Sequence, residues 1–230
     1  MVNGVTYRVD PHFRHMLGQE YDSAVAAFLQ KRVRPGDVCF DVGANVGVYV
    51  LQFAYWSAPG GKVIAFEPNP ATERILRRHI SINGLEDRVD VVPNAVGSAD
   101  GNAQFFLSGV DGMSRMGAPN RLIAGRTTET TVSVTTLDAF TAKVGFDPDW
   151  LLIDIEGFEI QALLGARDLI HRTWGKMGMV VEMHPGVWDS ADTTRELANE
   201  VLDAMRLRSI PLTGQRDPLS EHGLVYLEPR

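Results

Sequence analysis

The segment VCFDVGANVGVYV, residues 38–50, constrains the fold more than any other part of the chain. It has the pattern of a buried strand, a turn that carries two glycines, and the start of a helix. Gly43 permits a positive φ or a close backbone approach to a ligand, and Gly47 permits tight packing of the helix against the strand. Such a strand–turn–helix unit predicts an open α/β sheet that binds its ligand at the carboxyl ends of the strands.

Apolar runs alternate with amphipathic helical patterns along the rest of the chain. We expect helices at residues 20–33, 46–55, 70–83, 137–144, 159–164 and 193–205. Buried strands are expected at 38–42, 62–66, 89–93, 150–155 and 179–183, short strands at 102–107 and 131–135, and an antiparallel hairpin from 207–213 and 223–228. This order predicts a Rossmann-like α/β fold whose seven-stranded, mostly parallel sheet carries helices on both faces.

The 230 residues show no repeat and no linker, so we expect a single domain spanning residues 1–230. Residues 1–35 are predicted to form an N-terminal helical segment. Residues 108–131 are polar and rich in Gly, Ser, Thr and Arg. Because long loops inside compact domains are usually functional or disordered, this stretch is predicted to be a loop or lid over the substrate.

Charge and cysteine content exclude several classes of protein. The net charge of −7 argues against a nucleic-acid partner, because nucleic-acid binders usually carry a basic face. Cys39 is the single cysteine, so neither an internal disulfide nor a cysteine-based zinc cluster can form. The N-terminus lacks the apolar core of a signal peptide, and the longest apolar run, Val46 to Trp56, is too short to span a membrane. We expect a cytoplasmic protein, and its oligomeric state is left open.

The spacing around the glycine turn distinguishes between cofactors. A dinucleotide site requires G-x-G-x-x-G, whereas this chain has D-x-G-x-x-x-G, with Asp41 before the first glycine. A carboxylate at this position repels a diphosphate and suits a ligand that carries an ammonium group. S-adenosylmethionine has an ammonium group, a carboxylate and a sulfonium, and no phosphate. We therefore expect Asp41, Gly43, Asn45 and Gly47 to bind S-adenosylmethionine.

Two further strand ends support a nucleoside cofactor. Glu67 closes the next strand in VIAFEPNP, where an acidic side chain can accept both ribose hydroxyls, and Pro68 follows it. The third strand ends on Asn94 and Ala95, where the adenine is expected to lie. Asn94 can hydrogen-bond the base edge, or it can simply stabilise a turn.

Carboxylates cluster after the strand in WLLIDIEGFE. Asp154 ends this strand and is predicted to point into the same crevice as the cofactor residues. Glu159 lies early in the next helix, where it can merely complement the helix dipole. For Glu156, the sequence favours neither a position in the site nor one on the surface.

The following strand, MVVEMH, places Glu182 and His184 two residues apart and therefore on one side. An ordinary imidazole titrates near neutrality, so His184 is predicted to accept a hydroxyl proton, with Asp154 orienting and Glu182 supporting. A purely structural histidine is the alternative. No metal is expected, although Asp154 and Glu182 could instead hold a divalent cation that acidifies the hydroxyl.

The motifs DVGANVG at 41–47, FEPNP at 66–70, NAVG at 94–97 and LIDIEGFE at 152–159 resemble the FkbM family of methyltransferases. The resemblance implies a class I fold, S-adenosylmethionine contacts at Gly43, Asn45, Glu67 and Asn94, and Asp154 at the active centre. It further implies O-methylation of a hydroxylated small molecule, such as a secondary metabolite or sugar.

Two other functions are weighed against this one. An NAD-dependent oxidoreductase or epimerase would require G-x-G-x-x-G and usually a Tyr-x-x-x-Lys pair, and the sequence has neither. A catalytically silent cofactor-binding module would be expected to have lost acidic strand ends. Asp41, Glu67 and Asp154 are all intact.

Overall fold

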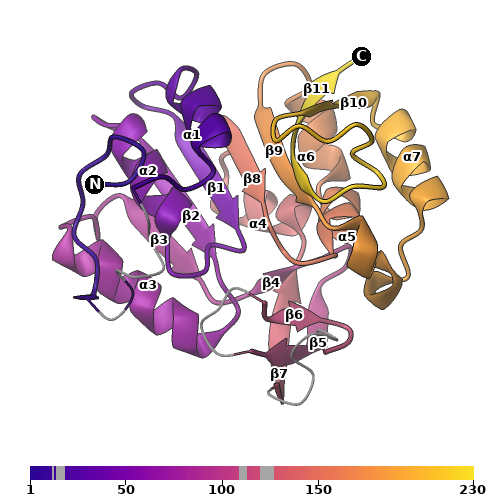
Figure 1. Ribbon diagram of the computed structural model, residues 1–230, viewed down its shortest axis with the longest axis horizontal. Coiled ribbons are helices and arrows are strands. Elements are labelled where there is room, and N and C mark those ends of the chain that lie inside the picture. Colours follow the sequence, from indigo (N-terminus) through magenta and orange to yellow (C-terminus); the bar gives the residue numbers. More distant parts are fainter. Residues whose placement is uncertain (12, 14–18, 109–112, 120–126) are drawn as a thin grey trace.

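A seven-stranded sheet forms the centre of the protein (Figure 1). The fold comes from a computed structural model that describes residues 1–11, 13, 19–108, 113–119 and 127–230. The strand order is β10-β11-β9-β8-β1-β2-β3; the pairings from β9 to β3 are parallel, and β11 runs antiparallel to both of its neighbours. The strands are β1 (Val38–Val42), β2 (Lys62–Phe66), β3 (Val89–Val92), β8 (Trp150–Ile153), β9 (Gly178–Met183), β10 (Leu207–Pro211) and β11 (Gly223–Pro229).

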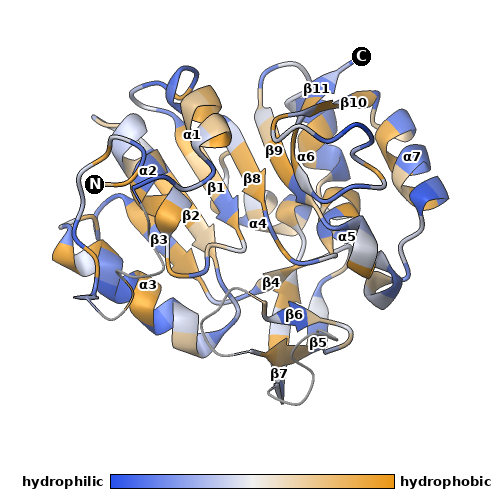
Figure 2. Cartoon of the chain, viewed as in Figure 1, coloured by the Kyte–Doolittle hydropathy of each residue, from blue (hydrophilic) through white to orange (hydrophobic). Residues whose placement is uncertain are grey.

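Helices cover both faces of this sheet, because successive strand residues point to opposite sides. Phe40 and Ile153 pack toward α4 to α7, whereas Cys39 and Leu152 pack toward α1 to α3. Figure 2 shows that the central strands are largely apolar, as expected of strands buried on both faces. The helices are α1 (Ser23–Gln30), α2 (Val48–Trp56), α3 (Pro70–Ile82), α4 (Leu137–Val144), α5 (Glu159–Leu164), α6 (Arg167–Arg172) and α7 (Arg195–Ala204). The predicted α/β class and sheet are confirmed, and α6 is an element that the sequence analysis did not predict.

Local capping explains where several helices begin and end. Asn69 caps α3 by accepting a hydrogen bond from the Ala71 amide, and Pro70 occupies the first helical turn. Thr136 caps α4 in the same way, and Gly145 ends that helix in the left-handed conformation. These caps place α3 directly after β2, so that residues 67–69 lie at the carboxyl edge of the sheet.

A second, four-stranded sheet lies below the main sheet in the view of Figure 1. Its order is β4-β7-β5-β6, from β4 (Ala95–Val96), β5 (Gly101–Leu107), β6 (Arg115–Met116) and β7 (Thr128–Thr135). The prediction of a continuous loop over 108–131 is therefore wrong at Arg115–Met116, which pairs with β5, and at the beginning of β7. The remainder of that prediction falls on 109–112 and 120–126, which lie outside the described residues.

The predicted helical segment over residues 1–35 is mostly wrong where the structure describes it. Only Ser23–Gln30 forms an α-helix among the described residues of that range. Val2 and Val5 form a β-bridge across a tight turn, because Asn3 and Gly4 both have positive φ. Both valines are buried, so this turn anchors the N-terminus by packing.

Candidate active site

A cavity of about 670 Å³ opens at the carboxyl ends of β1, β2, β8 and β9, beside the second sheet. Its volume falls in the range of about 300–1,000 Å³ that is typical of small-molecule sites. Its walls contain predicted site residues from the ends of five strands, β1, β2, β3, β8 and β9, together with residues that the sequence analysis did not single out. The predicted residues in the lining are Gly43, Asn45, Glu67, Pro68, Asn94, Ala95, Asp154, Glu182 and His184.

The glycine turn brings β1 against the end of β8. Gly43 has φ +89°, and a Cβ built on it would lie 1.8 Å from the Asp154 carbonyl oxygen. Gly47 has φ +96°, and its Cβ would lie 2.5 Å from Leu76 Cδ1 of α3. Gly47 therefore permits contact with a neighbouring helix instead of the predicted contact with the strand, and it is not among the described residues that line the cavity.

Asp41 is buried below this turn and does not contribute to the described cavity lining. It is 1% exposed. Burial, and secondarily the charge of Glu67, raises its pKa to about 7, while a hydrogen bond from the Val50 amide opposes the shift. One Asp41 carboxylate oxygen has no hydrogen-bond partner among the described residues. The geometry thus makes Asp41 a support of the turn, and the predicted direct ligand contact does not fit this position.

Glu67 connects the turn to the next strand. Its Oε2 accepts a hydrogen bond from the Asn45 amide at 2.7 Å, and its Oε1 accepts one from the Asn69 amide at 2.7 Å. Burial raises the pKa of Glu67, and these bonds partly offset that rise. A carboxylate offers about four acceptor positions, so both oxygens can still accept hydrogen bonds from hydroxyl groups of a ligand in the cavity.

We expect Glu67→Ala to weaken binding of S-adenosylhomocysteine at least about tenfold, because charge-assisted hydrogen bonds contribute about 1.5–3 kcal/mol each. Isothermal titration calorimetry measures this directly. Glu200→Ala, on the exposed side of α7, is the matched control and is expected to bind as the parent does. A Glu67→Ala dissociation constant equal to that of the parent would contradict the assignment.

Part of the cavity lining is apolar. Phe66, Val96 and Phe105 lie in this apolar wall beside Pro68 and Ala95. Such a surface suits the flat face of an adenine ring, and Asn94 lies in the same lining with its amide. The predicted adenine position agrees with this wall.

Three carboxyl groups meet at one end of the cavity. Asp154 Oδ1 and Glu182 Oε1 lie 3.9 Å and 4.0 Å from His184 Nε2. Burial, followed by the charge of Glu182, raises the pKa of Asp154. Glu156 has φ +52°, an uncommon conformation for a residue with this side chain, and it lines the same end. Glu156 thus belongs to the site and not to the outer surface.

His184 faces this carboxyl cluster and is held from behind by Glu159. Its Nδ1 lies 2.7 Å from Glu159 Oε1, while its Nε2 lies 3.9 Å from Asp154 Oδ1 and 3.8 Å from Glu156 Oε1. Burial alone lowers the pKa of His184. The hydrogen bond and charge of Glu159, with Asp154 and Glu156, outweigh burial and raise this pKa to about 10.

The prediction that His184 serves as the general base does not agree with this raised pKa, which favours a proton-donating role. A side chain with a pKa of about 10 carries its proton at neutral pH and donates hydrogen bonds. The sequence analysis assumed an ordinary imidazole, because burial and neighbouring charge come from residues distant in sequence. The group at this end of the cavity whose raised pKa suits it to accept a proton is Asp154.

Glu159 has a larger role than the predicted helix-dipole interaction. It is fully buried at 0% exposure, and it accepts hydrogen bonds from the Gly157 amide and from Trp188 Nε1 as well as His184. Three donors from separate segments thus fix one carboxylate. In the sequence, Glu159 could be recognised only as part of the motif LIDIEGFE. Its two distant partners are Trp188, in the 3₁₀ helix Pro185–Ala191, and His184, which lies between β9 and that helix.

We expect Glu159→Gln to lower the pKa of His184 substantially, because the charge next to Nδ1 is removed. In the parent, the folded pKa of about 10 lies above the ordinary 6.5. The stability that His184 contributes is therefore complete below about pH 6.5 and is lost as pH rises through about 10. NMR titration of the imidazole Cε1 proton and melting temperatures at pH 6 and pH 9 measure both effects. An unchanged His184 titration would show that Asp154 and Glu156 alone hold the proton.

Other residues at the site were not predicted. His222 precedes β11 and its Nε2 lies 2.7 Å from Glu182 Oε1. Tyr21, before α1, and Arg115, from β6, also line the cavity. Burial raises the pKa of Tyr21, so its hydroxyl stays neutral and can donate a hydrogen bond. All three come from segments for which the sequence showed no motif.

The chemistry of this cavity fits S-adenosylmethionine. Asn45 Oδ1 is a buried acceptor with no hydrogen-bond partner among the described residues, and it lines the cavity beside the glycine turn. Glu67 suits the ribose diol, the apolar wall suits the adenine, and the Asp154 end is negative where the cofactor carries its positive charges. A dinucleotide diphosphate would meet these carboxylates with repulsion.

Comparison with solved structures identifies the class of fold. The crystal structure of methyltransferase FkbM from Methylobacillus flagellatus KT superposes with a TM-score of 0.56 at 17% identity. The match covers 94% of this chain and 50% of that chain. The fold, together with the acidic strand ends around the cavity, is that of a Rossmann-like class I methyltransferase.

Residues 41–209, well over half of the chain, match the Methyltransferase FkbM domain family. The chain belongs to the FkbM family of S-adenosylmethionine-dependent methyltransferases, and the nicotinamide alternative is thereby wrong.

Two further relatives are similar to this chain over shorter segments. The 31-O-demethyl-FK506 methyltransferase FkbM of Streptomyces tacrolimicus is 48% identical over 58 residues, 25% of this chain and 22% of that protein. The ribosomal protein L11 methyltransferase of Carboxydothermus hydrogenoformans is 34% identical over 87 residues, 37% of this chain and 28% of that protein. The chain thus spans 22% and 28% of the lengths of these two relatives and 50% of the Methylobacillus flagellatus chain.

Proposed function

We propose that this protein transfers a methyl group from S-adenosylmethionine to a hydroxyl oxygen of a small molecule. The observation that carries the proposal is the Asp154 carboxyl group, which lines the cavity together with Glu182 and lies beside the fixed His184. A proton-accepting group is needed for an alcohol acceptor, because an alcohol loses its proton as the oxygen–methyl bond forms. The FK506-directed relative, by its name, methylates an oxygen.

S-adenosylmethionine supplies an electrophilic methyl group that an oxygen nucleophile displaces in line. The protein must therefore align the acceptor hydroxyl and take its proton. The Asp154 carboxylate accepts that proton, and its raised pKa makes it a stronger base than an ordinary aspartate. His184, protonated and held by Glu159, stabilises the negative charge of Asp154.

The acceptor is a small molecule because the acidic groups lie within a bounded cavity that also has to hold the cofactor. The net charge of −7 argues against a nucleic-acid substrate. The lone cysteine, Cys39, is buried, which is compatible with a reducing cytoplasmic setting. Across the described residues, no helix combines the length and apolar composition needed to cross a bilayer.

Incubating the protein with methyl-labelled S-adenosylmethionine tests the proposal. The panel should contain hydroxylated polyketides and sugars, their O-methylated counterparts as matched negatives, and ribosomal protein L11. Label transferred to a hydroxyl acceptor and absent from its methyl ether supports O-methylation. Label on L11 alone would contradict it, and tight cofactor binding with no transfer to any acceptor would favour the silent binding module.

A further inference from the structure

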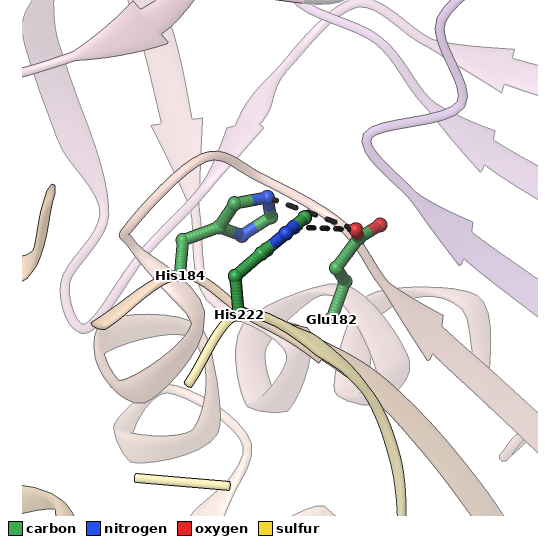
Figure 3. A group of neighbouring side chains, drawn as sticks. All are labelled: Glu182, His184 and His222. Carbon is green, nitrogen blue, oxygen red and sulfur yellow. Dashed lines mark ion pairs between the residues drawn. The ribbon is translucent and has the colours of Figure 1, made fainter. Parts of the chain in front are cut away.

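Two imidazoles and a carboxylate meet at the acidic end of the cavity (Figure 3). Glu182, His184 and His222 each offer one ligand atom, and these atoms lie within 4.8 Å of one another. Glu182 Oε1 is 2.7 Å from His222 Nε2 and 4.0 Å from His184 Nε2. Figure 3 shows both imidazole rings directed toward the same carboxylate. Small side-chain rotations would bring these three atoms within bonding distance of one metal ion.

The sheet itself produces this meeting. Glu182 and His184 are two residues apart along β9 and its extension, so they lie on one side. β11 runs antiparallel to β9, with Gly223 opposite Met183 and Leu224 opposite Glu182. Continuing that register by one residue brings His222 opposite His184, and their ring centroids lie 4.7 Å apart. Two segments almost forty residues apart thereby supply one donor set.

His184 is already oriented as a metal ligand. A metal-bound histidine usually donates its other ring N–H to a carboxylate or carbonyl, which fixes the ring and the tautomer. Here Nδ1 faces Glu159 at 2.7 Å, and Glu159 is itself fixed by Gly157 and Trp188. Nε2 is thus the ring nitrogen that points toward Glu182.

The surrounding charge favours a cation at this point. Asp154 and Glu156 lie 3.9 Å and 3.8 Å from His184 Nε2, and Glu182 lies on the same side. Among the lining residues that the structure describes, Arg115 is the one Lys or Arg side chain. Several carboxylates sharing a half-buried site repel one another, and a divalent ion reduces that repulsion.

We propose that Glu182, His184 and His222 bind a divalent first-row transition-metal ion, such as Mn²⁺, Co²⁺ or Zn²⁺. Two imidazoles with one carboxylate favour these ions over Mg²⁺, which prefers oxygen ligands and octahedral water. This donor set differs from the divalent-cation site that the sequence analysis weighed at Asp154 and Glu182, and three protein ligands leave further coordination positions for water or substrate. An ion at this site replaces the proton on His184 Nε2 and occupies the Glu182 carboxylate. If the O-methyltransferase function holds, such an ion would polarise the acceptor hydroxyl while Asp154 accepts its proton.

The test measures metal binding without an acceptor. Untagged protein is stripped with a chelator, dialysed and titrated with Mn²⁺ followed by electron paramagnetic resonance, and with Co²⁺ followed by its visible absorption. We expect one ion per chain and an increase in melting temperature. His222→Ala, at a side chain 63% exposed, and Glu182→Gln are expected to weaken binding at least about tenfold. His171→Ala, at an exposed histidine on α6, is the matched control.

Saturable binding that is lost in His222→Ala and retained in His171→Ala supports the site. No saturable binding in the parent, or equal affinity in His222→Ala, overturns it. These outcomes stand whether or not any acceptor is methylated, so failure of the metal site is distinguishable from failure of the proposed function.

Discussion

Asp154→Asn is expected to lower methyl transfer by about 10²–10⁴-fold at saturating cofactor, the range for loss of a general base. Asparagine keeps the shape of the side chain but cannot receive a proton. Burial and the neighbouring Glu182 raise the pKa of Asp154, so turnover of the parent should increase as pH rises through that raised pKa. A steady-state pH profile measures this limb, and Asp154→Asn should lose it.

Asp203→Asn is the matched control, since Asp203 is exposed on α7 and pairs with Arg230. It should retain the full rate and the same pH profile. Turnover of Asp154→Asn within a few-fold of the parent would show that Asp154 only orients the acceptor. In that case Glu182 or the proposed ion would have to remove the proton.

Gly43→Ala is expected to lower the free energy of unfolding by about 3–5 kcal/mol, the sum of left-handed backbone strain and overpacking. The added Cβ would lie 1.8 Å from the Asp154 carbonyl oxygen, and backbone atoms cannot move aside as a side chain can. The turn and the end of β8 must therefore separate, which also moves Asp154. Urea unfolding measures the loss.

Gly36→Ala separates the two contributions. Gly36 has φ +94°, close to the +89° of Gly43, but a Cβ there meets nothing within 4 Å. Gly36→Ala should lower the free energy of unfolding by only about 1–2 kcal/mol, the strain of the left-handed conformation. Equal losses at the two positions would mean that the close approach of β1 to Asp154 does not matter for stability.

The sequence by itself determined the sheet and most of its strand ends. Apolar runs with flanking glycine or proline can be recognised locally, and parallel strands joined by helices bring their carboxyl ends to one edge. For this reason Gly43, Glu67 and Asp154, which follow three different strands, were correctly predicted to meet. The antiparallel pair at the C-terminus was predictable because two strand patterns follow one another with no helical pattern between them.

Only the tertiary structure decided the chemistry of the groups that meet there. Asp41 and Asp154 both lie near the carboxyl end of a strand, yet Asp41 lies inside β1 and is buried under the turn, whereas Asp154 follows the last residue of β8 and lines the cavity. His184 was predicted to be a base from its ordinary pKa, but Glu159 and two other carboxylates raise that pKa to about 10. His222 carries no motif and reaches Glu182 only through the register of β11 on β9. Local patterns encode which face and which end a residue occupies, whereas burial, charge and contact depend on segments that meet only after folding.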